Sequence, residues 1–319
     1  MDLQKIQHGS IQKEMEILEL KLTEFLSSEV SLATKVASYL VKSGGKRIRP
    51  TLTILTGKAF GYKDKNLITL ACAIELLHTA SLIHDDVVDQ SDIRRGKTSI
   101  HRKWDNAHGV LVGDFVYSKA FQLMSSLENN KIITILADST NRISEGEILQ
   151  LTLKKKNKIK EKDYFDIIGR KTAELFKASV QSAALLAKVS KDQYQSMTNF
   201  AYSLGIVFQL NDDLLDYMGK EFQTGKKIGK DFEEGKLTLP LIKTLDLCTK
   251  KEASLIRSSL LSKKFENFKE VRSIMKSSGA LNEIDKIIQK YSSSCVSELE
   301  KLPSSPYKQS LKKIVTGQG

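Results

Sequence analysis

Two acidic clusters of identical spacing lie far apart in the chain. One falls in the stretch HTASLIHDDVVDQSDIRRGK and the other in FQLNDDLLDYMGK, and their aspartates are Asp85, Asp86 and Asp89, and Asp212, Asp213 and Asp216. On a helix, the first and last aspartate of each cluster share one face, where like charges repel by roughly 0.2–0.5 kcal/mol per pair. A solvated acidic helix end would explain one such cluster, but two clusters inside apolar helices predict a cation between them.

The ligand types in the clusters indicate which cation this is. Carboxylate oxygens without histidine or cysteine suit Mg²⁺, which typically takes one or two carboxylates and leaves positions for substrate phosphates. The clusters therefore predict a magnesium site that binds a phosphorylated substrate.

Cationic residues suited to phosphate oxygens occur in four short segments. The segments are GGKRIRP with Lys46 and Arg49, RRGK with Arg94 and Arg95, KTAELF with Lys171 and Thr172, and GKKIGKDFEEGK with Lys226 and Lys236. Arginine forks match diphosphate oxygens in geometry, whereas each lysine taken alone is more simply a surface residue. His78 and Ser81 lie on the aspartate face one to two turns before the first cluster, which favours a role for His78 in the same site.

The bulk properties are those of an ordinary globular protein with excess positive charge. Its 319 residues are 40% hydrophobic and 28% charged, with a net charge of +12, and no apolar run comes near the roughly 18 residues that span a bilayer. Aromatic residues do not alternate with basic ones, so a nucleic-acid partner is not expected. The polar N-terminus and three scattered cysteines predict a cytoplasmic protein without disulfides or a zinc site. The lysine-rich run at 154–163 is most simply a solvated loop, with contact to anionic lipid as the lesser alternative.

Hydrophobic periodicity predicts helices almost throughout. Apolar residues three and four apart recur in stretches such as 67–77, 175–187 and 201–215, whereas no alternating strand pattern is convincing. Glycines and the four prolines mark the breaks, and Pro50 is placed to open a helix. Because no repeat, composition break or linker occurs, residues 1–319 are predicted to form one all-α domain.

Eight segments together resemble those of a known enzyme family. GGKRIRP, ELLHTASLIHDDVVD, RRGK, GDFVYSKAF, EGEILQ, KTAELF, FQLNDDLLD and EGKLTLP follow one another as they do in trans-isoprenyl diphosphate synthases, most strongly over residues 40–245. The chain is similar to the long-chain bacterial branch in particular. Class I terpene cyclases share the first motif, but Asp216 and Lys220 stand where their second motif has a hydroxyl residue and an acid, which disfavours that class.

The resemblance implies a fold and a reaction. The fold is a single-domain bundle of antiparallel helices around a central cavity, with the two aspartate motifs facing each other across its mouth. The reaction is the Mg²⁺-dependent, head-to-tail condensation of isopentenyl diphosphate with an allylic diphosphate, in the simplest case farnesyl diphosphate. A homodimer packed through helices, and peripheral membrane contact when the lipophilic product leaves, are also expected.

The resemblance also implies roles for individual residues. About three Mg²⁺ ions would be held by Asp85, Asp89 and Asp212, with Asp86, Asp213 and Asp216 in support. The charge on the departing diphosphate would be shared by Arg94, Lys171, Lys226 and Lys236. Isopentenyl diphosphate would be bound by Lys46, Arg49, His78 and Arg95. Thr172 and Gln209 would line the cavity near the allylic cation.

Product length is expected to depend on the helix before the first motif. Ala80 and Ser81 are small, whereas bulky aromatics at these positions would plug the cavity in the short-chain pattern of the family. A long product of about eight units (octaprenyl), serving as a quinone side-chain precursor, is therefore expected. Met124 is the candidate floor of the cavity with Leu136 beyond it, and both could equally be ordinary core residues.

Three alternatives to this function remain open at this point. A medium-chain synthase (C20–C35) would share the chemistry and differ at the cavity floor. A non-catalytic subunit of a heteromeric synthase would usually lose one or both aspartate motifs, and this chain keeps both. A basic helical protein that binds lipid or nucleic acid would leave the paired motifs unexplained.

Overall fold

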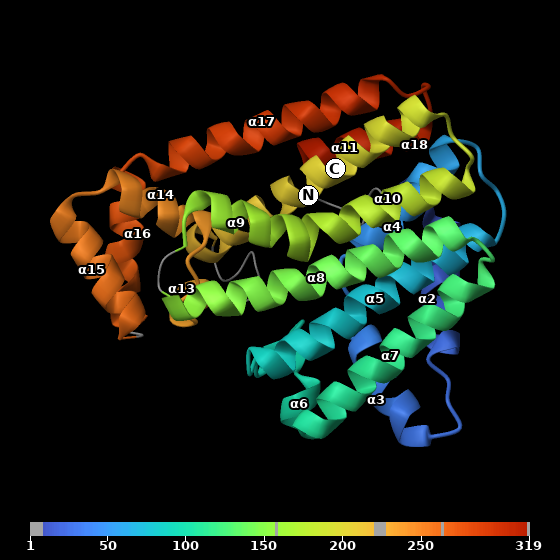
Figure 1. The fold of residues 1–319 in the computed structure, drawn as a ribbon, viewed down its shortest axis with the longest axis horizontal. Coiled ribbons are helices and arrows are strands. Elements are labelled where there is room, and N and C mark those ends of the chain that lie inside the picture. The colour runs from blue at the N-terminus through green and yellow to red at the C-terminus, as the bar shows by residue number, and fades with distance from the viewer. Residues whose placement is uncertain (1–8, 157–158, 220–227, 263–264, 318–319) are drawn as a thin grey trace. The chain divides into compact units, whose positions relative to one another are not determined.

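Helices make up nearly all of the regular structure in this computed structural model (Figure 1), which describes residues 9–156, 159–219, 228–262 and 265–317. The one sheet in the described residues consists of two strands of two residues each. The prediction of an all-α fold is therefore confirmed.

The chain divides into two compact units. The first unit comprises Met1–Thr140, Leu175–Phe200 and Val296–Gly319, and the second comprises Asn141–Glu174 and Ala201–Cys295. The prediction that residues 1–319 form a single domain stays a prediction.

Most elements fall within one unit. Those of the first unit are α2 (Gln12–Phe25), α3 (Ser31–Val41), α4 (Ile48–Ala59), α5 (Asn66–Val88), β1 (Ile93–Arg94), β2 (Lys97–Thr98), α6 (Ile100–Lys103), α7 (Asn106–Ser126), most of α10 (Glu174–Leu186) and α18 (Pro306–Thr316). Those of the second are α9 (Glu161–Ile168), η1 (Gly169–Ala173), α13 (Lys230–Glu233), α14 (Leu239–Leu247), α15 (Lys250–Leu261), η2 (Phe265–Asn267) and α16 (Phe268–Ser277). The remaining three, α8 (Asn130–Lys156), α11 (Lys191–Met218) and α17 (Ala280–Glu300), contain boundaries between the units.

Helix α5 is the central core element of the first unit. It packs most extensively against α7 and also contacts α4 and α2, and the predicted apolar positions between Leu67 and Leu77 are buried. The sequence was expected to contain no apolar run long enough to span a bilayer, but α5 is long and apolar enough to do so. However, 67% of its most apolar 18-residue window is buried inside the protein, as in the core helix of a soluble protein.

Prolines and capping residues set several helix boundaries. Pro50 lies in the first turn of α4, as predicted, where its missing N–H costs no intrahelical hydrogen bond. Thr249 and Glu252 form a capping box at the start of α15, each side chain accepting a backbone N–H from the other's position. The two ends of the described chain meet in the first unit, where the Ser310 hydroxyl donates to that of Ser10 at 3.0 Å.

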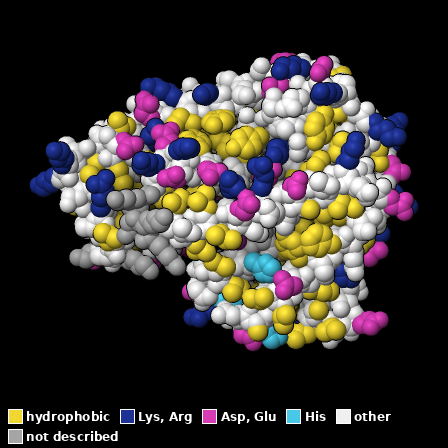
Figure 2. Space-filling model, in the orientation of Figure 1, with side chains coloured by type: hydrophobic (Ala, Val, Ile, Leu, Met, Phe, Trp, Pro, Cys, Tyr) yellow, Lys and Arg dark blue, Asp and Glu magenta, His cyan; other side chains and the backbone are white. Residues whose placement is uncertain are grey.

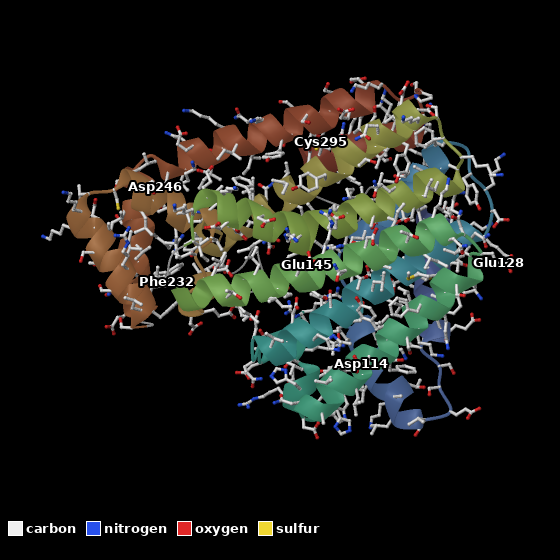
Figure 3. All side chains as sticks on the ribbon, viewed as in Figure 1. Asp114, Glu128, Glu145, Phe232, Asp246 and Cys295 are labelled. Atoms are coloured by element: carbon white, nitrogen blue, oxygen red, sulfur yellow. The ribbon has the colours of Figure 1, made fainter. Side chains whose placement is uncertain are left out.

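The second unit has two apolar clusters. One joins α9 and η1 to α11 and α14 around Tyr164 and Leu210. The other lies among α11 and α13–α16 around Tyr217, Phe268 and Phe232, the last of which is labelled in Figure 3. Both clusters include residues of α11, the helix that carries the second aspartate motif.

A β-hairpin between α5 and α6 was not predicted from the sequence. Ile93 pairs with Thr98 and Arg94 with Lys97, so Arg95 and Gly96 form the turn. Both turn residues have positive φ, 53° and 73°, as a type I′ turn requires. Strands of two residues are too short to give an alternating pattern, which is why the sequence showed none.

Candidate active site

The first aspartate motif forms the last turn of α5. Asp85 and Asp89 are half-buried and one turn apart, with the backbone N–H of Asp89 donating to the carbonyl of Asp85 at 2.8 Å. Asp86 points elsewhere because neighbouring helical residues lie about 100° apart around the axis. It is only 2% exposed, and its Oδ1 accepts a hydrogen bond from Nε of Arg94 at 2.9 Å.

Arg94 therefore belongs to the carboxylate cluster. Burial on its own would lower the pKa of Arg94, but the hydrogen bond and charge of Asp86 raise it, and the charges of Asp85 and Asp89 add to the increase. The structure thus places Arg94 beside the first motif, with Asp86 as its direct partner, and its predicted role at the departing diphosphate stays a prediction.

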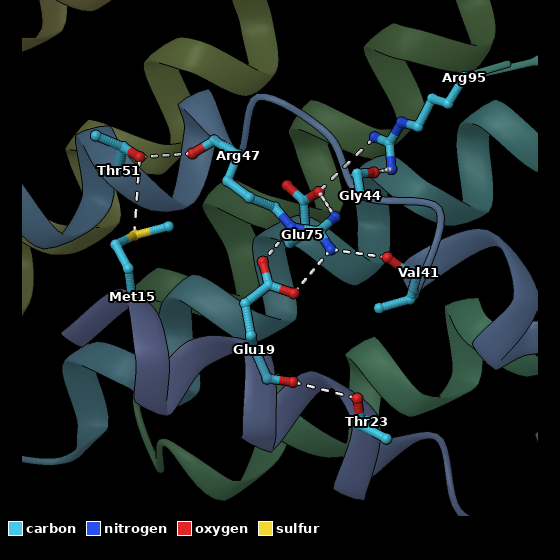
Figure 4. Close-up of polar contacts among 9 residues, drawn as sticks. All are labelled: Met15, Glu19, Thr23, Val41, Gly44, Arg47, Thr51, Glu75 and Arg95. Atoms are coloured by element: carbon cyan, nitrogen blue, oxygen red, sulfur yellow. Dashed lines mark hydrogen bonds and ion pairs between the residues drawn. The ribbon is translucent and has the colours of Figure 1, made fainter. Parts of the chain in front are cut away.

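The hairpin separates the two adjacent arginines. Arg94 reaches Asp86, whereas Arg95 donates to the carbonyl of Gly44 in the GGKRIRP loop (Figure 4). A Cβ on Gly45, whose φ is 153°, would lie 2.7 Å from Cζ of Arg95, so a larger residue there would displace the guanidinium from its present position. Gly44 has a φ of 76°, a left-handed conformation that favours glycine.

Three predicted arginines of the first unit, Arg49, Arg94 and Arg95, lie near His78 together with Arg47, which was not predicted. Burial lowers the pKa of His78 well below its ordinary value, and the nearby charges of Arg49, Arg95, Arg94 and Arg47 lower it further. His78 is thus a neutral donor or acceptor among fixed cations. Lys46 is exposed at the edge of the same loop.

Arg49 is one of the two buried arginines in this group, with Arg47. It is 6% exposed, its guanidinium lies 4.8 Å from the ring centroid of Phe176, and burial lowers its pKa to about 10. Its buried Nε has no hydrogen-bond partner within the described residues. An unsatisfied buried donor of this kind suits an anionic ligand.

The predicted chain-length residues all lie in the first unit. Ala80, Met124 and Leu136 are almost completely buried, on α5, α7 and α8 respectively. Ser81 is half-buried, and its hydroxyl donates to the carbonyl of His78 at 2.8 Å. Their roles in setting product length stay predictions.

The second aspartate motif lies on α11 in the second unit. Asp212 is exposed, Asp216 is half-buried, and Asp213 is 3% exposed. Asp213 accepts hydrogen bonds from the Tyr164 hydroxyl at 2.6 Å and from Nε2 of Gln209 at 2.7 Å. Oε1 of Gln209 accepts in turn from the hydroxyl of Thr172 at 2.7 Å.

Asp213, Gln209 and Thr172 in this hydrogen-bonded chain were predicted as site residues, whereas Tyr164 was missed. Burial raises the pKa of Asp213 to about 7, the bonds from Tyr164 and Gln209 oppose the rise, and the charges of Asp212 and Asp216 add to it. Tyr164 comes from α9, 49 residues earlier in sequence, and no local pattern connects it to the motif.

Asp216 organises the start of α13. Its two carboxylate oxygens accept backbone N–H groups from Lys230 at 3.1 Å and Asp231 at 2.9 Å. Burial raises the pKa of Asp231 well above its ordinary value, and the charges of Asp213 and Asp216 raise it further. Asp231 was also missed, although it lies inside the GKKIGKDFEEGK segment.

The predicted lysines of the second unit are paired with acidic side chains. Nζ of Lys171 lies 2.6 Å from Glu147 and donates to Gln150 at 2.6 Å. Nζ of Lys236 lies 2.7 Å from Glu234. An incoming diphosphate would have to replace these carboxylates. The predicted ligand Lys226 lies outside the described residues.

Lys171 and Thr172 lie on a π-helical turn, η1, which sequence reasoning did not predict. The backbone of the turn is approached closely by α11, because a Cβ on Gly205 would lie 2.5 Å from Cα of Ala173. Arg170 in the same turn pairs with Asp166 and with Glu145 of α8, labelled in Figure 3. Insertions of this type often mark functional sites in helices.

The donor set can be compared with the requirements of Mg²⁺. Asp85, Asp89 and Asp212 all present carboxylate oxygens at exposed or half-buried positions, which suits a hard cation that keeps several water molecules. Within the described parts of the chain, no three His, Cys, Asp or Glu side chains are already grouped to hold a metal ion. The predicted arrangement of the two motifs across one mouth stays a prediction.

Comparison with known proteins identifies the class to which this site belongs. The sequence profile of the polyprenyl synthetase family matches residues 30–278. The chain therefore belongs to this family of trans-isoprenyl diphosphate synthases and is a prenyltransferase.

Individual relatives match over nearly their full length. Octaprenyl diphosphate synthase of Escherichia coli is 38% identical over 312 residues, covering 98% of this chain and 96% of the relative. The geranyl-diphosphate-specific all-trans-nonaprenyl-diphosphate synthase of Rhodobacter capsulatus is 39% identical over 292 residues, covering 91% and 89%. A crystal structure of polyprenyl synthase from Caulobacter crescentus, complexed with calcium and isoprenyl diphosphate, aligns with a TM-score of 0.93 and 33% identity over 98% and 96% of the two chains.

Proposed function

We propose that this protein is a Mg²⁺-dependent, long-chain all-trans-polyprenyl diphosphate synthase that extends farnesyl diphosphate with isopentenyl diphosphate. The observation that carries the proposal lies within the first unit. There, Arg94 binds Asp86 beside the Asp85–Asp89 carboxylate face, and its charge also reaches His78. Next to it lies a basic cradle, by which we mean Lys46, Arg49, His78 and Arg95. A carboxylate face for metal ions beside arginines for a second diphosphate suits a reaction between two diphosphates.

The metal would act on the leaving group. When bound, Mg²⁺ supplies Lewis-acid stabilisation of the negative charge that develops on the departing diphosphate. Asp85, Asp89 and Asp212 would hold it, and Asp86 would keep Arg94 directed toward the same oxygens. Lys171, Lys226 and Lys236 would supply further positive charge after exchanging carboxylate partners for phosphate.

The cradle would hold isopentenyl diphosphate while its double bond reacts. The C1–O bond of the allylic substrate breaks, the alkene electrons form a bond from C4 of isopentenyl diphosphate to C1, and a proton leaves C2. The released diphosphate would accept that proton. Thr172 and Gln209 would present oxygens near the cation, and Asp213 would fix Gln209 through its 2.7 Å hydrogen bond.

An octaprenyl product is the specific outcome that we propose, with a quinone side chain as its use. Small residues at Ala80 and Ser81 and the similarity to an octaprenyl synthase support it. Medium-chain products remain the alternative, because a relative from Methanosarcina mazei, 38% identical over 69% of this chain, is a geranylgeranyl diphosphate synthase. A non-catalytic role is the second alternative, and the retention of both aspartate motifs argues against it.

A homodimer is proposed through α7. Val110, Leu111 and Phe121 on this helix are 44%, 67% and 44% exposed, and Figure 2 shows hydrophobic side chains gathered on the face where α7 lies. Apolar side chains left exposed along one helix are typical of a surface that pairs with another copy. Light scattering after gel filtration should give twice the chain mass, and Leu111→Glu should shift it toward the monomer.

A cytoplasmic location with peripheral membrane contact completes the proposal. The net charge of +12 favours attraction to anionic lipid. Vesicles containing anionic lipid should retain the protein at low salt and release it as salt is raised. Failure of such vesicles to retain the protein would exclude this contact.

Product analysis tests the central proposal. Purified protein is incubated with farnesyl diphosphate, radiolabelled isopentenyl diphosphate and Mg²⁺, and the products are dephosphorylated and separated by length. A dominant C40 product is expected, and geranyl diphosphate serves as the competing primer. A shorter product would refute the octaprenyl assignment, whereas the absence of incorporation would favour the non-catalytic subunit.

A further inference from the structure

Glu75 is a buried carboxylate surrounded by arginines of the first unit. It lies on α5 one turn before His78 and is 1% exposed. Its Oε1 accepts a hydrogen bond from Nη1 of Arg47 at 2.8 Å and lies 4.0 Å from Nη2 of Arg95 (Figure 4). A buried acid between two cations from separate loops can determine where both loops lie.

Arg47 is bound on all sides, which distinguishes it from its neighbours in GGKRIRP. Its Nε and Nη2 donate to Glu19 of α2 at 2.6 and 3.0 Å, and Nη2 also donates to the carbonyl of Val41 at 2.9 Å. Its backbone has a φ of 47°, a left-handed conformation that non-glycine residues rarely adopt. Such backbone conformations persist where several contacts hold them, and they are concentrated at ligand-binding sites.

Arg95 is held in the opposite loop by the same carboxylate. It has a φ of 53°, donates to the carbonyl of Gly44 and lies against the backbone of Gly45. Burial lowers the pKa of Arg95 and that of Arg49, and the negative charge of Glu75 opposes this effect at both residues. Glu75 thus offsets the repulsion among Arg47, Arg49 and Arg95, which lie close together.

We propose that Glu75 is a positioning residue for the second diphosphate, acting through Arg47 and Arg95 to hold the basic cradle in its binding geometry. Glu19 supports it by fixing the outer side of Arg47. This inference rests on the proposed function, because it assumes that the cradle binds isopentenyl diphosphate. Glu75 itself need not touch the substrate.

Positioning and simple electrostatics predict opposite results for Glu75→Gln. If Glu75 were only a negative charge near an anion site, its removal would tighten binding of isopentenyl diphosphate. If it positions the cradle, binding should weaken by about 10- to 100-fold, the range expected for a misplaced binding group. The KM for isopentenyl diphosphate should rise by the same factor, with kcat and the KM for farnesyl diphosphate changed less than about threefold.

The first measurement is calorimetric titration of isopentenyl diphosphate into the protein in EDTA, so that it does not depend on metal or turnover. Weaker binding by Glu75→Gln than by the wild type supports the inference, and equal or tighter binding overturns it. If the wild type itself fails to bind under these conditions but incorporates substrate with Mg²⁺, the inference fails while the proposed function stands. If it neither binds nor incorporates, both fail.

Two further variants keep the test interpretable. Glu19→Gln acts on the same arginine from a half-exposed position and should weaken binding about three- to tenfold; it replaces Glu75→Gln if that variant does not fold by circular dichroism. Glu14→Gln removes a different ion pair of α2, to Lys58 at 2.5 Å, and should leave binding unchanged. Loss of binding in Glu14→Gln equal to that in Glu19→Gln would show that general loosening of α2 explains the effect.

Discussion

The two aspartate motifs have the same spacing, but their middle carboxylates are held in different ways. Asp86 in the first unit is paired with a charged guanidinium, that of Arg94, whereas Asp213 in the second unit is bound by two neutral donors, Tyr164 and Gln209. The hydrogen bonds from these neutral donors only partly offset the effect of burial, which raises the pKa of Asp213 to about 7. Identical sequence patterns can therefore have different electrostatic environments.

The cations near the two motifs also differ in how they are held. In the first unit, Arg47 and Arg49 are buried, and Arg47 and Arg95 lie in loops at positions with positive φ, whereas Lys171 and Lys236 of the second unit are paired with glutamates. Fixed arginines form a site before any ligand arrives. Paired lysines can bind a diphosphate only after exchanging partners, which suits a group that must also be released.

The largest effect on activity is expected at the outer aspartates of the first motif rather than at the middle one. Asp85→Asn should lower kcat by about 10²–10³-fold, because it removes a proposed metal ligand at the developing charge. It should also raise the Mg²⁺ concentration needed for half-maximal rate. Asp138→Asn, at an exposed carboxylate on α8, is the control, and an equal loss there would contradict the assignment.

Asp86→Asn should act mainly on stability. It leaves the partly buried Arg94 without its charged partner, at a cost of about 1–3 kcal/mol in the free energy of unfolding. Urea denaturation measures this cost. Asp92→Asn breaks the exposed pair with Arg102, 3.1 Å apart, and should change stability by no more than about 0.5 kcal/mol. Equal effects in the two variants would remove the distinction between buried and exposed pairs.

Tyr164→Phe tests the neutral donors of the second unit. Losing one hydrogen bond to a buried carboxylate should cost about 1–2 kcal/mol of stability. Activity should fall less than in Asp85→Asn, because Gln209 still binds Asp213. Thermal unfolding and initial rates provide both measurements, with Tyr202→Phe, at a partly exposed position, as the control. A loss of rate as large as that of Asp85→Asn would require a direct role for the hydroxyl.

The smallest effect concerns pH and His78. Its pKa is lowered in the folded protein, so the folded state keeps it neutral while the unfolded state takes up a proton below its ordinary pKa of about 6.5. Stability contributed by this residue is complete above pH 6.5 and is lost as the pH falls below it. His78→Gln should therefore unfold with a weaker dependence on pH between about 6.5 and 5. An unchanged dependence would refute the burial of a neutral imidazole.

Much of the fold and the list of candidate residues followed from sequence. The apolar spacing around Leu70 and Leu204 predicted α5 and α11, because one face of each helix must be buried. Pro50 marked a helix start, and the order of eight segments indicated the family. Asp85 and Asp89 share a face of the helix whatever surrounds them, so their pairing could be predicted as well.

The partners of these residues were decided only by tertiary structure. Glu75 looked like any acid in an apolar helix, and its contacts with Arg47 and Arg95 depend on two loops 28 and about 20 positions away in the chain. The hydroxyl of Tyr164, the π-helical turn at Lys171 and the hairpin that directs Arg94 and Arg95 apart are equally non-local. Spacing along one helix fixes directions within that helix, whereas burial, charge pairing and pKa depend on what the rest of the chain places beside it.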